Sequence, residues 1–514
     1  MKALIVGCTA ALLATAMPDH ASAPGAACDT LATLVRPHAT ITSAQLVAAG
    51  AFAPPGRGAA PASDASPFDS LPAFCRVAAT LAPSADSDIK IEVWMPAAGW
   101  NGKLQAVGNG GWSGAIPYGP LGAALRRGYA AASTDTGHSG GSGRFAQGHP
   151  EKLIDFAWRA VHEMTVQAKA IIAAFYGSGP RLSYWTGCSS GGKQGLKEAQ
   201  RFPADYDGIV AGAPANFWTH LMVGDLWPAH ATLIDPASYI PQEKYAAIHN
   251  AALDACDALD GVRDGLIEDP TRCRFDPKAL LCAGADSPTC LTAPQVEAAR
   301  KIYAGPSDPR TGKQIFPGLE PGSELGWNAL AGGPEPLPIP VDHFKYVVFE
   351  DPRWDFRTLS FDRDVERADA LDHGLINATD ANLKPYFGSR AHRGKLLLYH
   401  GWNDQLIAPR NTINYYKSVV DAVGDPRKAA DSVRLFMVPG MAHCAGGEGT
   451  TSFDAVSAIE QWVEQGKAPD QIVAAHLRAG VADRTRPLCP YPQVAQYTGT
   501  GSTDDAASFA CRMP

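Results

Sequence analysis

Residues 182–201 read LSYWTGCSSGGKQGLKEAQR, in which an apolar run leads into a glycine-rich turn and then into a helical stretch. Residues 182–186 predict a buried strand, and residues 192–201 predict a helix. Between them lies a Gly-x-Ser-x-Gly pentapeptide that is centred on Ser189. Small residues around a serine allow the sharp turn that exposes a nucleophilic hydroxyl between a strand and a helix. The stretch therefore predicts a nucleophile elbow with Ser189 as the nucleophile.

A second Gly-x-Ser-x-Gly pentapeptide is centred on Ser139. It continues into Gly140-Gly141-Ser142-Gly143, which is typical of a loop and not of a helix. In a chain with 51 glycines, one chance match to so short a pattern is unremarkable. Ser139 is therefore predicted to be a loop residue without a catalytic role.

Strand and helix patterns alternate on both sides of the elbow. Apolar runs typical of strands occur at residues 103–107, 129–133, 207–214, 395–399 and 433–438. Residues 153–175 carry apolar side chains at helical spacing. Strands that alternate with helices predict a parallel sheet with helices on both faces.

The alternation is lost between residues 216 and 372, where prolines, glycines, aromatic residues and four cysteines accumulate. Because the candidate catalytic residues lie on both sides of this segment, two separate domains explain the pattern less well than one interrupted domain. We therefore expect an α/β-hydrolase fold. Its core would comprise residues 24–215 and 373–514, and residues 216–372 would form an inserted lid domain.

The other catalytic residues are expected after the lid, because in α/β-hydrolases the acid and the histidine follow the serine along the chain. Asp404 and His443 each stand one loop beyond a predicted strand. A serine hydroxyl attacks well only when a base takes its proton and a carboxylate orients that base. Asp404 and His443 are therefore predicted to complete a triad with Ser189. Other histidines fit this order less well, namely His138, His392 and His400.

An oxyanion hole needs two backbone N–H groups aimed at the tetrahedral oxygen. The first donor is expected from Ser190, directly after the nucleophile. The second is expected from the glycine loop that follows the strand at residues 103–107, where Gly110 and Gly111 allow close approach of the backbone. The sequence does not distinguish between these two glycines.

The N-terminus indicates export. Lys2 precedes an apolar stretch, residues 3–17, and Ala21-Ser22-Ala23 follows, which together are typical of a signal peptide comprising residues 1–23. About 15 apolar residues are too few for a membrane-spanning helix, which needs about 20. The protein is therefore expected to be secreted or periplasmic, with no membrane association.

Eleven cysteines are present, and Cys8 would be removed with the signal peptide. The remaining even number predicts disulfides in an oxidising compartment, although spacing alone does not settle their pairing. The absence of a Cys-x-x-Cys motif argues against zinc-finger or thioredoxin-like chemistry. A net charge of −8 gives no electrostatic case for nucleic-acid binding. The sequence carries no signal for an oligomeric state.

In combination, these motifs resemble the tannase/feruloyl esterase family, which also contains the mono(hydroxyethyl) terephthalate hydrolases. Cys188 before the predicted nucleophile and Cys444 after the predicted base look like the Cys-Ser and His-Cys motifs of that family, whose members join them in a disulfide. The motifs at 108–111 and 133–138 match in order as well. The resemblance covers nearly the whole mature chain. It implies the pairs Cys28–Cys75, Cys188–Cys444, Cys256–Cys273, Cys282–Cys290 and Cys489–Cys511.

The lid carries a cluster of carboxylates, Asp257, Asp260 and Asp264. Ca²⁺ prefers such oxygen donors, but the EF-hand spacing is not met, and an acidic surface turn is an equally good explanation from the residues alone. The family resemblance favours a metal, because the lids of that family bind calcium at this pattern. It implies the side chains of Asp257, Asp260 and Asp264 and the carbonyls of Val262 and Leu266 as ligands of a structural Ca²⁺, with no organic cofactor.

The expected substrate is a small aromatic ester. Several lid aromatics could stack on an aromatic acyl group, although the lid's own core explains most of them better: Trp327, Phe344, Tyr346, Phe349, Trp354 and Phe356. Terephthalate half-ester hydrolases similar to this chain use a lid arginine and an aromatic near the acid. Here Arg353 and Arg357 are the only candidates for that arginine, and Ile407 stands at the aromatic position.

The leading hypothesis is a secreted serine esterase that hydrolyses feruloyl or other hydroxycinnamoyl esters through an acyl-enzyme. Gallate esters, as in tannases, or a terephthalate half-ester are the nearest alternatives. A serine peptidase on the same fold would need a site for the peptide amine, and none is evident. A non-catalytic binding protein would be expected to lack a triad residue, and none is missing.

Overall fold

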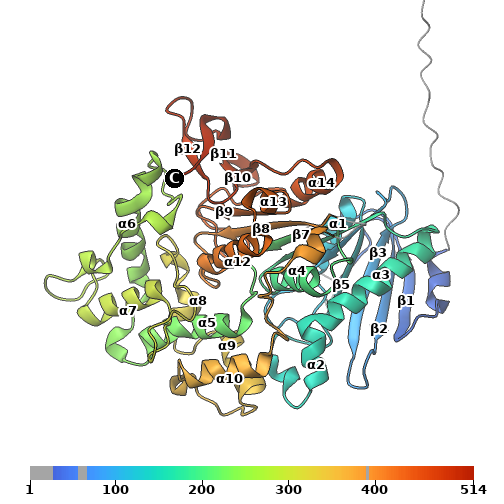
Figure 1. Cartoon of the computed structure of the whole chain (residues 1–514), viewed down its shortest axis with the longest axis horizontal. Coiled ribbons are helices and arrows are strands. Elements are labelled where there is room, and N and C mark those ends of the chain that lie inside the picture. The colour runs from blue at the N-terminus through green and yellow to red at the C-terminus, as the bar shows by residue number, and fades with distance from the viewer. Residues whose placement is uncertain (1–26, 56–65, 389–392) are drawn as a thin grey trace, which may run out of the picture.

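A computed structural model describes residues 27–55, 66–388 and 393–514 of the chain (Figure 1). The predicted signal peptide, Cys8 and His392 lie outside the described residues.

The centre of the molecule is a nine-stranded sheet with the strand order β1-β2-β3-β5-β4-β6-β7-β8-β9. Three strands at one edge are antiparallel to their neighbours: β1 (Ala39–Val47), β2 (Phe74–Leu81) and β3 (Ile89–Pro96). The other six are parallel to one another: β4 (Lys103–Val107), β5 (Ala130–Thr134), β6 (Leu182–Cys188), β7 (Gly208–Gly212), β8 (Lys395–Gly401) and β9 (Val433–Val438). The parallel part is the sheet that the apolar runs predict.

Register brings the carboxyl ends of the parallel strands together. Cys188 at the end of β6 lies opposite Gly212 at the end of β7, and Gly401 at the end of β8 lies opposite Val438 at the end of β9. The loops that leave these ends therefore meet at one edge of the sheet, where open α/β sheets bind their ligands.

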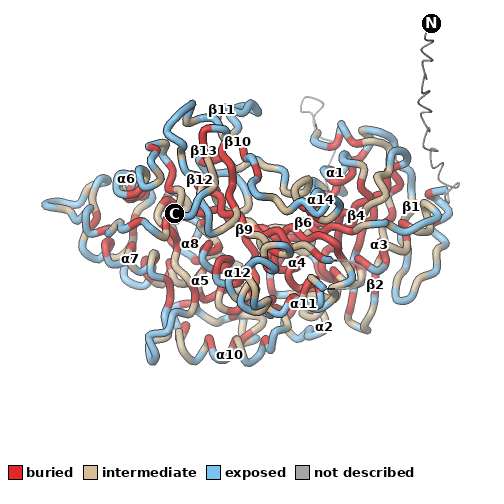
Figure 2. Tube along the Cα trace, turned by 45° about the horizontal axis from the view of Figure 1, so that its top comes forward, coloured by how far each residue is buried: buried red, intermediate tan, exposed pale blue. Residues whose placement is uncertain are grey.

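Helices cover both faces of the sheet, as the burial-coloured trace also shows (Figure 2). The helices of the core are α1 (Tyr118–Arg126), α2 (Pro150–Ile154), α3 (Ala160–Tyr176), α4 (Ser190–Arg201), α11 (Lys384–Gly388), α12 (Pro409–Val423), α13 (Pro426–Ala430) and α14 (Ala455–Gln465). One hydrophobic cluster packs α3, α4 and α12 against the sheet, and a second packs α1 and α14 on the opposite side. Alternate residues of β8 divide accordingly, with Leu396 and Leu398 in the first cluster and Leu397 in the second.

The helix predicted over residues 153–175 is not continuous. A π-helical turn, Asp155–Arg159, separates α2 from α3. The Asp155 side chain is fully buried and pairs with Arg159 at 2.5 Å, and it also accepts a hydrogen bond from Ser87. Local apolar spacing does not reveal this turn, because it depends on a partner from another part of the chain.

Between β7 and β8 the chain forms a separate helical layer, on the left of and below the sheet in Figure 1. Its helices are α5 (Trp218–Leu233), α6 (Tyr245–Cys256), α7 (Ala293–Ala304), α8 (Asn328–Ala331), α9 (Pro338–Asp342) and α10 (Arg363–Asp372). These helices bury two hydrophobic clusters. Trp327 belongs to one of them, and Phe344 and Phe356 belong to the other, which also includes core residues such as Trp112 and Phe156. The three lid aromatics belong to this buried interior, as the sequence favoured for most of the lid aromatics.

The C-terminal region adds two small antiparallel sheets, formed by β10 (Ile472–Arg478) with β11 (Val481–Leu488), and by β12 (Val494–Tyr497) with β13 (Phe509–Arg512). Val262 of the lid packs with Cys489, Ala495 and Phe509 of this region. The last 40 residues therefore connect the core to the acidic loop of the lid.

Five disulfides join the described cysteines: Cys28–Cys75, Cys188–Cys444, Cys256–Cys273, Cys282–Cys290 and Cys489–Cys511. These are the pairs that the resemblance implies. Cys188–Cys444 spans 256 residues of sequence and joins the elbow to the loop after β9. Within the described residues, no helix is both long enough and apolar enough to cross a membrane.

Candidate active site

Ser189 lies in the turn between β6 and α4 with φ +63° and ψ −123°. A side chain other than glycine rarely adopts a positive φ, and the strain of such a conformation is typical of a functional turn. The turn is held by a hydrogen bond from Ser189 N–H to Gly212 O (3.0 Å), while the Ser189 carbonyl accepts from Lys193 (3.0 Å) and Ala215 (3.1 Å). The local structure therefore has the strand–turn–helix geometry that a nucleophile elbow requires.

Close packing explains the glycines of the elbow. A Cβ at Gly108 would lie 2.6 Å from Gly191 Cα, and one at Gly187 would lie 2.4 Å from Gly191 O. Since real Cβ atoms essentially never approach so closely, the backbone at the start of α4 can come this near to the loop after β4 and to the end of β6 only because these positions are glycines.

Asp404 follows β8 and is completely buried. Its Oδ1 accepts hydrogen bonds from the backbone N–H groups of Leu406 and Ile407, both at 2.9 Å. Its Oδ2 accepts from His443 Nδ1 (2.8 Å) and from His400 Nε2 (3.0 Å). Burial would raise the pKa of Asp404, but the two histidines outweigh burial and hold the pKa well below its usual range. Asp404 is therefore an ionised carboxylate aimed at His443.

His443 lies in the loop after β9. Its Nδ1–H donates to Asp404, which leaves Nε2 as the nitrogen able to accept a proton. Burial lowers the pKa of His443, but the charge of Asp404 and the hydrogen bond to it outweigh burial and raise the pKa above its ordinary value of 6.5. This is the tautomer and orientation that a general base needs.

The Cys188–Cys444 disulfide connects the residue before Ser189 to the residue after His443, with the two Cα atoms 5.9 Å apart. Within the described chain the Ser189 hydroxyl has no hydrogen-bond partner, and His443 Nε2 lies 3.6 Å from Cys444 Sγ. Catalytic hydrogen bonds commonly tighten only when substrate binds. The disulfide thus keeps the hydroxyl and the imidazole in the same small region.

The loop after β4 supplies candidate oxyanion donors. Ser190 Oγ donates to Gly111 O (2.9 Å), which fixes the loop against the start of α4, and Gly111 has φ +52°. Among the described residues, neither the Gly110 N–H nor the Gly111 N–H donates to a protein group. Both glycines therefore remain candidates beside the Ser190 N–H.

Sequence reasoning missed residues that hold this loop. Asn109 N–H donates to Gln194 Oε1 (3.1 Å), and Gln194 Nε2 donates to Asn109 Oδ1 (3.2 Å), so a reciprocal amide pair ties the loop to α4. His138 Nε2–H donates to Trp112 O at 2.6 Å. Residues 133–138 match a motif of the family, but the sequence did not indicate that His138 holds the loop after β4 in place through this hydrogen bond.

His400 and Asp225 were also missed as neighbours of the triad acid. His400 Nε2–H lies within hydrogen-bond distance of both Asp404 and Ile407 O (2.9 Å), and His400 Nδ1 accepts from Thr412 (2.7 Å). His400 therefore orients Asp404 and is not the base. Asp225 of α5 is buried, and burial followed by the charge of Asp404 raises its pKa well above its ordinary value. Burial and the charge of Asp404 therefore both favour the protonated form of this lid carboxyl group.

Ser139 occupies a loop in which Gly140 pairs with Gly114 by backbone hydrogen bonds. Ser139 lies beside Asp135, His138 and Arg144 in a surface pocket that does not include the triad. The structure thus places Ser139 in a loop, away from Asp404 and His443.

Each of the three aspartates in the acidic lid loop contacts a neighbouring group of the protein. Asp257 accepts from the backbone of Asp264 and Gly265, both at 3.1 Å, and Asp260 accepts from Val262 N–H at 2.9 Å. Asp264 pairs with Arg486 at 2.5 Å. Within the described chain, the side-chain groups whose ligand atoms converge within 4.8 Å are Cys282/Asp286/Cys290 and His162/Glu198/Asp205, so the three loop aspartates are not among them. Cys282 and Cys290 are joined in a disulfide and have no free thiolate.

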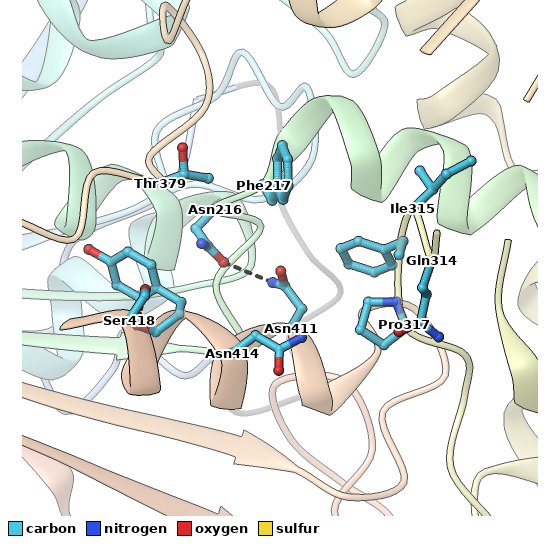
Figure 3. Close-up of a pocket in the computed structure, with 11 residues that line it drawn as sticks. Asn216, Phe217, Gln314, Ile315, Pro317, Thr379, Asn411, Asn414 and Ser418 are labelled. Carbon is cyan, nitrogen blue, oxygen red and sulfur yellow. Dashed lines mark hydrogen bonds between the residues drawn. The ribbon is translucent and has the colours of Figure 1, made fainter. Parts of the chain in front are cut away.

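A cavity of about 300 Å³ lies at the boundary of the lid and the core, beside the starts of α5 and α12 (Figure 3). Asn411 Nδ2 donates to Asn216 Oδ1 (2.8 Å) in its wall. All of its lining residues are uncharged: Asn216, Phe217, Gln314, Ile315, Phe316, Pro317, Thr379, Asn411, Asn414, Tyr415 and Ser418. No triad residue lines it, so this cavity is distinct from the candidate catalytic site.

Comparison with known proteins agrees with this architecture. A family model described as tannase and feruloyl esterase matches residues 75–512. An uncharacterized esterase of Xanthomonas campestris pv. campestris is 42% identical over 533 residues, covering 95% of this chain and 91% of the relative. A probable feruloyl esterase B-1 of Aspergillus oryzae is 35% identical over 470 residues, covering 87% and 85%.

The crystal structure of feruloyl esterase B from Aspergillus oryzae has a TM-score of 0.88 and 32% sequence identity, and the match covers 94% of this chain and 99% of that one. This similarity confirms the α/β-hydrolase fold class that the strand and helix patterns predict. The chain belongs to the tannase and feruloyl esterase family and is a carboxylic ester hydrolase.

Proposed function

We propose that the chain hydrolyses esters of aromatic carboxylic acids through a Ser189–His443–Asp404 triad. The observation that carries the proposal is the buried Asp404–His443 pair, whose Oδ2 and Nδ1 atoms are 2.8 Å apart. A disulfide joins it to the strained Ser189 turn. Few structural roles require an ionised buried carboxylate, an oriented imidazole and a serine with φ +63° to meet at the ends of three strands.

The chemistry proceeds in two balanced halves. Ser189 Oγ attacks the ester carbonyl while His443 Nε2 takes the hydroxyl proton, and the resulting tetrahedral oxyanion expels the alcohol, which receives that proton. Water then attacks the acyl-enzyme with His443 again as the base, and the acid leaves as Ser189 recovers its proton. Throughout, Asp404 stabilises the imidazolium without being protonated itself.

The oxyanion would be stabilised by the Ser190 N–H at the start of α4 and by the N–H of Gly110 or Gly111. The Asn109–Gln194 amide pair and the Ser190–Gly111 hydrogen bond hold the two segments at a constant separation. Preorganised donors stabilise the transition state without further reorganisation, which is the main advantage of fixing this loop.

Hydroxycinnamoyl esters such as ferulates are the favoured substrates. The names of the relatives, feruloyl esterases, support this choice, and these proteins match nearly the whole chain. Gallate esters and terephthalate half-esters are the alternatives. Arg353 and Arg357 are largely exposed and pair with Asp351 and Asp355, and Ile407 is buried, which offers little support for a terephthalate carboxylate site.

The test is a hydrolysis panel of methyl ferulate, methyl gallate, chlorogenate and a terephthalate half-ester, with Ser189→Ala as the control. We expect methyl ferulate or chlorogenate to give the highest kcat/KM, and Ser189→Ala to lose about 10⁶-fold on every substrate that the wild type hydrolyses. Retained hydrolysis in Ser189→Ala would refute the mechanism. Equal, weak rates on all four esters would refute the substrate assignment while leaving the mechanism intact.

We also propose that the acidic loop holds a structural Ca²⁺ through the side chains of Asp257, Asp260 and Asp264 and the carbonyls of Val262 and Leu266. The all-oxygen donor set fits Ca²⁺. The local charge supports it too, because Glu268 adds a fourth acidic group, while the hydrogen bonds that arginines of the described chain make to the group come from Arg484 and Arg486. Burial, and then repulsion by Asp264 and Asp257, raise the pKa of Asp260 to about 6. A bound dication would neutralise this excess.

We also propose that the chain is exported with removal of its N-terminal segment and that it folds into a core and a lid. Residues 1–23 would be removed on export to a secreted or periplasmic location, which the five disulfides support. Residues 24–215 and 373–514 would form the catalytic core, with residues 216–372 as the lid. Mass spectrometry of the exported protein would reveal the new N-terminus, and limited proteolysis would reveal the lid boundaries.

A further inference from the structure

A second cluster of titratable side chains lies in the core, away from the triad. It consists of His162 on α3, Glu198 on α4 and Asp205 in the loop before β7, and one ligand atom from each lies within 4.8 Å of the others. His162 Nδ1 is 2.7 Å from Asp205 Oδ2. Glu198 stands more than two helical turns along α4 from Ser190, where the helix begins at the nucleophile. The catalytic mechanism uses none of these groups.

Glu198 is the unusual member of the cluster. The residue is 1% exposed, and within the described chain no donor group reaches its carboxylate oxygens, whose one side-chain partner is the neighbouring acid Asp205. Lys169 and Arg201 act on Glu198 only through their charge, because Lys169 Nζ donates to the Asp205 carbonyl and the Arg201 guanidinium lies over the Trp158 ring. A buried carboxylate of this kind requires either a cation or a proton.

The donor geometry matches a metal centre. Ligand atoms on one ion with bonds of about 2.0–2.2 Å lie roughly 3 Å apart, close to the His162–Asp205 separation of 2.7 Å. One imidazole nitrogen with two carboxylates suits Zn²⁺ and similar first-row dications, whereas Ca²⁺ prefers oxygen ligands alone. Phe202 stacks on the His162 ring at 3.6 Å and so orients the imidazole without occupying its nitrogens.

The solvent exposure and the charge of the cluster also match a metal site. The His162 and Asp205 side chains are 25% and 14% exposed, so the site is open on one side, while Glu198 closes the other. Two carboxylates and a neutral imidazole carry a charge of −2, which one dication balances. The open side leaves room for a solvent ligand in the fourth position.

We propose that His162, Glu198 and Asp205 bind one first-row divalent cation, with Zn²⁺ as the best match. The ion joins α3 to the far end of the nucleophile helix and to the loop that leads into β7. It is structural and takes no part in ester hydrolysis. The competing explanation is a proton shared by Glu198 and Asp205, which would satisfy the buried carboxylate without any metal.

The experiment uses the purified full-length exported protein, stripped with a chelator and then returned to saturating Ca²⁺ so that oxygen-only sites are filled. Zn²⁺ is titrated by calorimetry, and Co²⁺ serves as a visible probe of nitrogen and oxygen coordination. We expect one equivalent of Zn²⁺, Co²⁺ absorption in the visible range and a higher Tm in the presence of Zn²⁺.

Glu198→Gln is the decisive variant, because it keeps the shape of the side chain and removes its charge. We expect its Zn²⁺ affinity to fall by roughly 100-fold or more, since loss even of an outer group commonly costs about 10- to 100-fold. Without Zn²⁺ its Tm should equal or exceed that of the wild type. If this variant does not fold, Asp205→Asn, at a partly exposed position, provides the same readout.

His476→Gln is the matched control. His476 Nδ1 contacts Asp483 Oδ1 at 2.6 Å in an exposed pair that lacks a third ligand, so this variant should bind Zn²⁺ like the wild type. Failure of the wild type to bind stoichiometric Zn²⁺ would overturn the proposal in favour of the shared proton. Equal Zn²⁺ binding by Glu198→Gln would place the ion elsewhere and overturn it as well.

Discussion

The catalytic loops and the acidic loop of the lid are both irregular segments, but different forces hold them. At the catalytic loops, each Asp404 oxygen accepts two hydrogen bonds, and a disulfide joins the serine turn to the histidine loop. At the acidic loop, backbone N–H groups satisfy part of the carboxylates, and two arginines face four acids. The protein completes the first region by itself, whereas the second leaves an excess of acidic groups that the proposed cation would balance.

The two regions touch. A Cβ at Gly440 would lie 2.5 Å from Leu266 Cδ2, so the acidic loop packs against the backbone three residues before His443. Arg484 adds a second link, because it donates to Asp264 O and to Glu448 O. Disorder in the acidic loop would therefore reach the histidine loop through packing, and its effect on catalysis should be indirect.

The largest expected effect comes from Asp404→Asn, which tests whether the catalytic region depends on an ionised acid. The amide can no longer hold His443 in the tautomer with a free Nε2, and we expect kcat to fall by about 10⁴-fold. Steady-state kinetics on the best ester measures this loss. Asp225→Asn is the control, because burial and the charge of Asp404 favour the protonated form of that neighbouring acid, so its substitution should leave kcat within about tenfold. Comparable losses of kcat in both variants would mean that catalysis depends on the packing of these buried side chains and not on the charge of Asp404.

Removal of the Cys188–Cys444 disulfide tests how far a covalent link completes the catalytic region. On the chain-entropy model, the double variant Cys188→Ser/Cys444→Ser should lose up to roughly 5 kcal/mol of the free energy of unfolding, together with activity. The matched Cys282→Ser/Cys290→Ser variant removes a link of only 8 residues and should lose about half as much, with activity retained. Denaturant unfolding and kinetics at a temperature where both variants are folded separate the two losses. Full activity in the first variant would exclude a positioning role for the disulfide.

The pH dependence of kcat/KM tests the electrostatic part of the same region. His443 must be neutral to act as the base, and Asp404 raises the pKa of His443 above 6.5. Activity should therefore fall by about tenfold per pH unit below a midpoint that lies on the alkaline side of 6.5. A midpoint clearly below 6.5 in the wild type would contradict the strong Asp404–His443 interaction.

Removal of calcium should have the smallest effect on catalysis. It tests whether the acidic loop, unlike the catalytic loops, depends on a bound cation. Treatment with EGTA is expected to lower Tm by roughly 5 °C, while kcat measured well below Tm changes little. Asp260→Asn should show a reduced response to EGTA. An unchanged Tm after EGTA would mean that the loop is an acidic surface turn. A large loss of kcat at low temperature would mean that the loop directly shapes the active site.

The sequence predicted those parts of the fold that depend on local pattern. Strands β4 and β9 coincide with their predicted ranges, because buried parallel strands are continuous apolar runs. Strand β1 escaped prediction, since all of its residues are exposed or partly buried and it contains no such run. The sequence could single out candidate triad residues because a nucleophile elbow has strict local requirements and because chain order restricts its partners.

Tertiary structure was required wherever a side chain acts through a distant partner. His400 orients Asp404, the Asn109–Gln194 pair holds the oxyanion loop, and Glu198 meets His162 between two helices. None of these contacts leaves a local signature, because each joins groups that are adjacent only after the sheet has formed. The sequence by itself determines the elbow, the order of the triad and the family. The hydrogen bonds, charges and close contacts that make the site work exist only in the folded chain, where long-range packing fixes distances that spacing along the sequence does not encode.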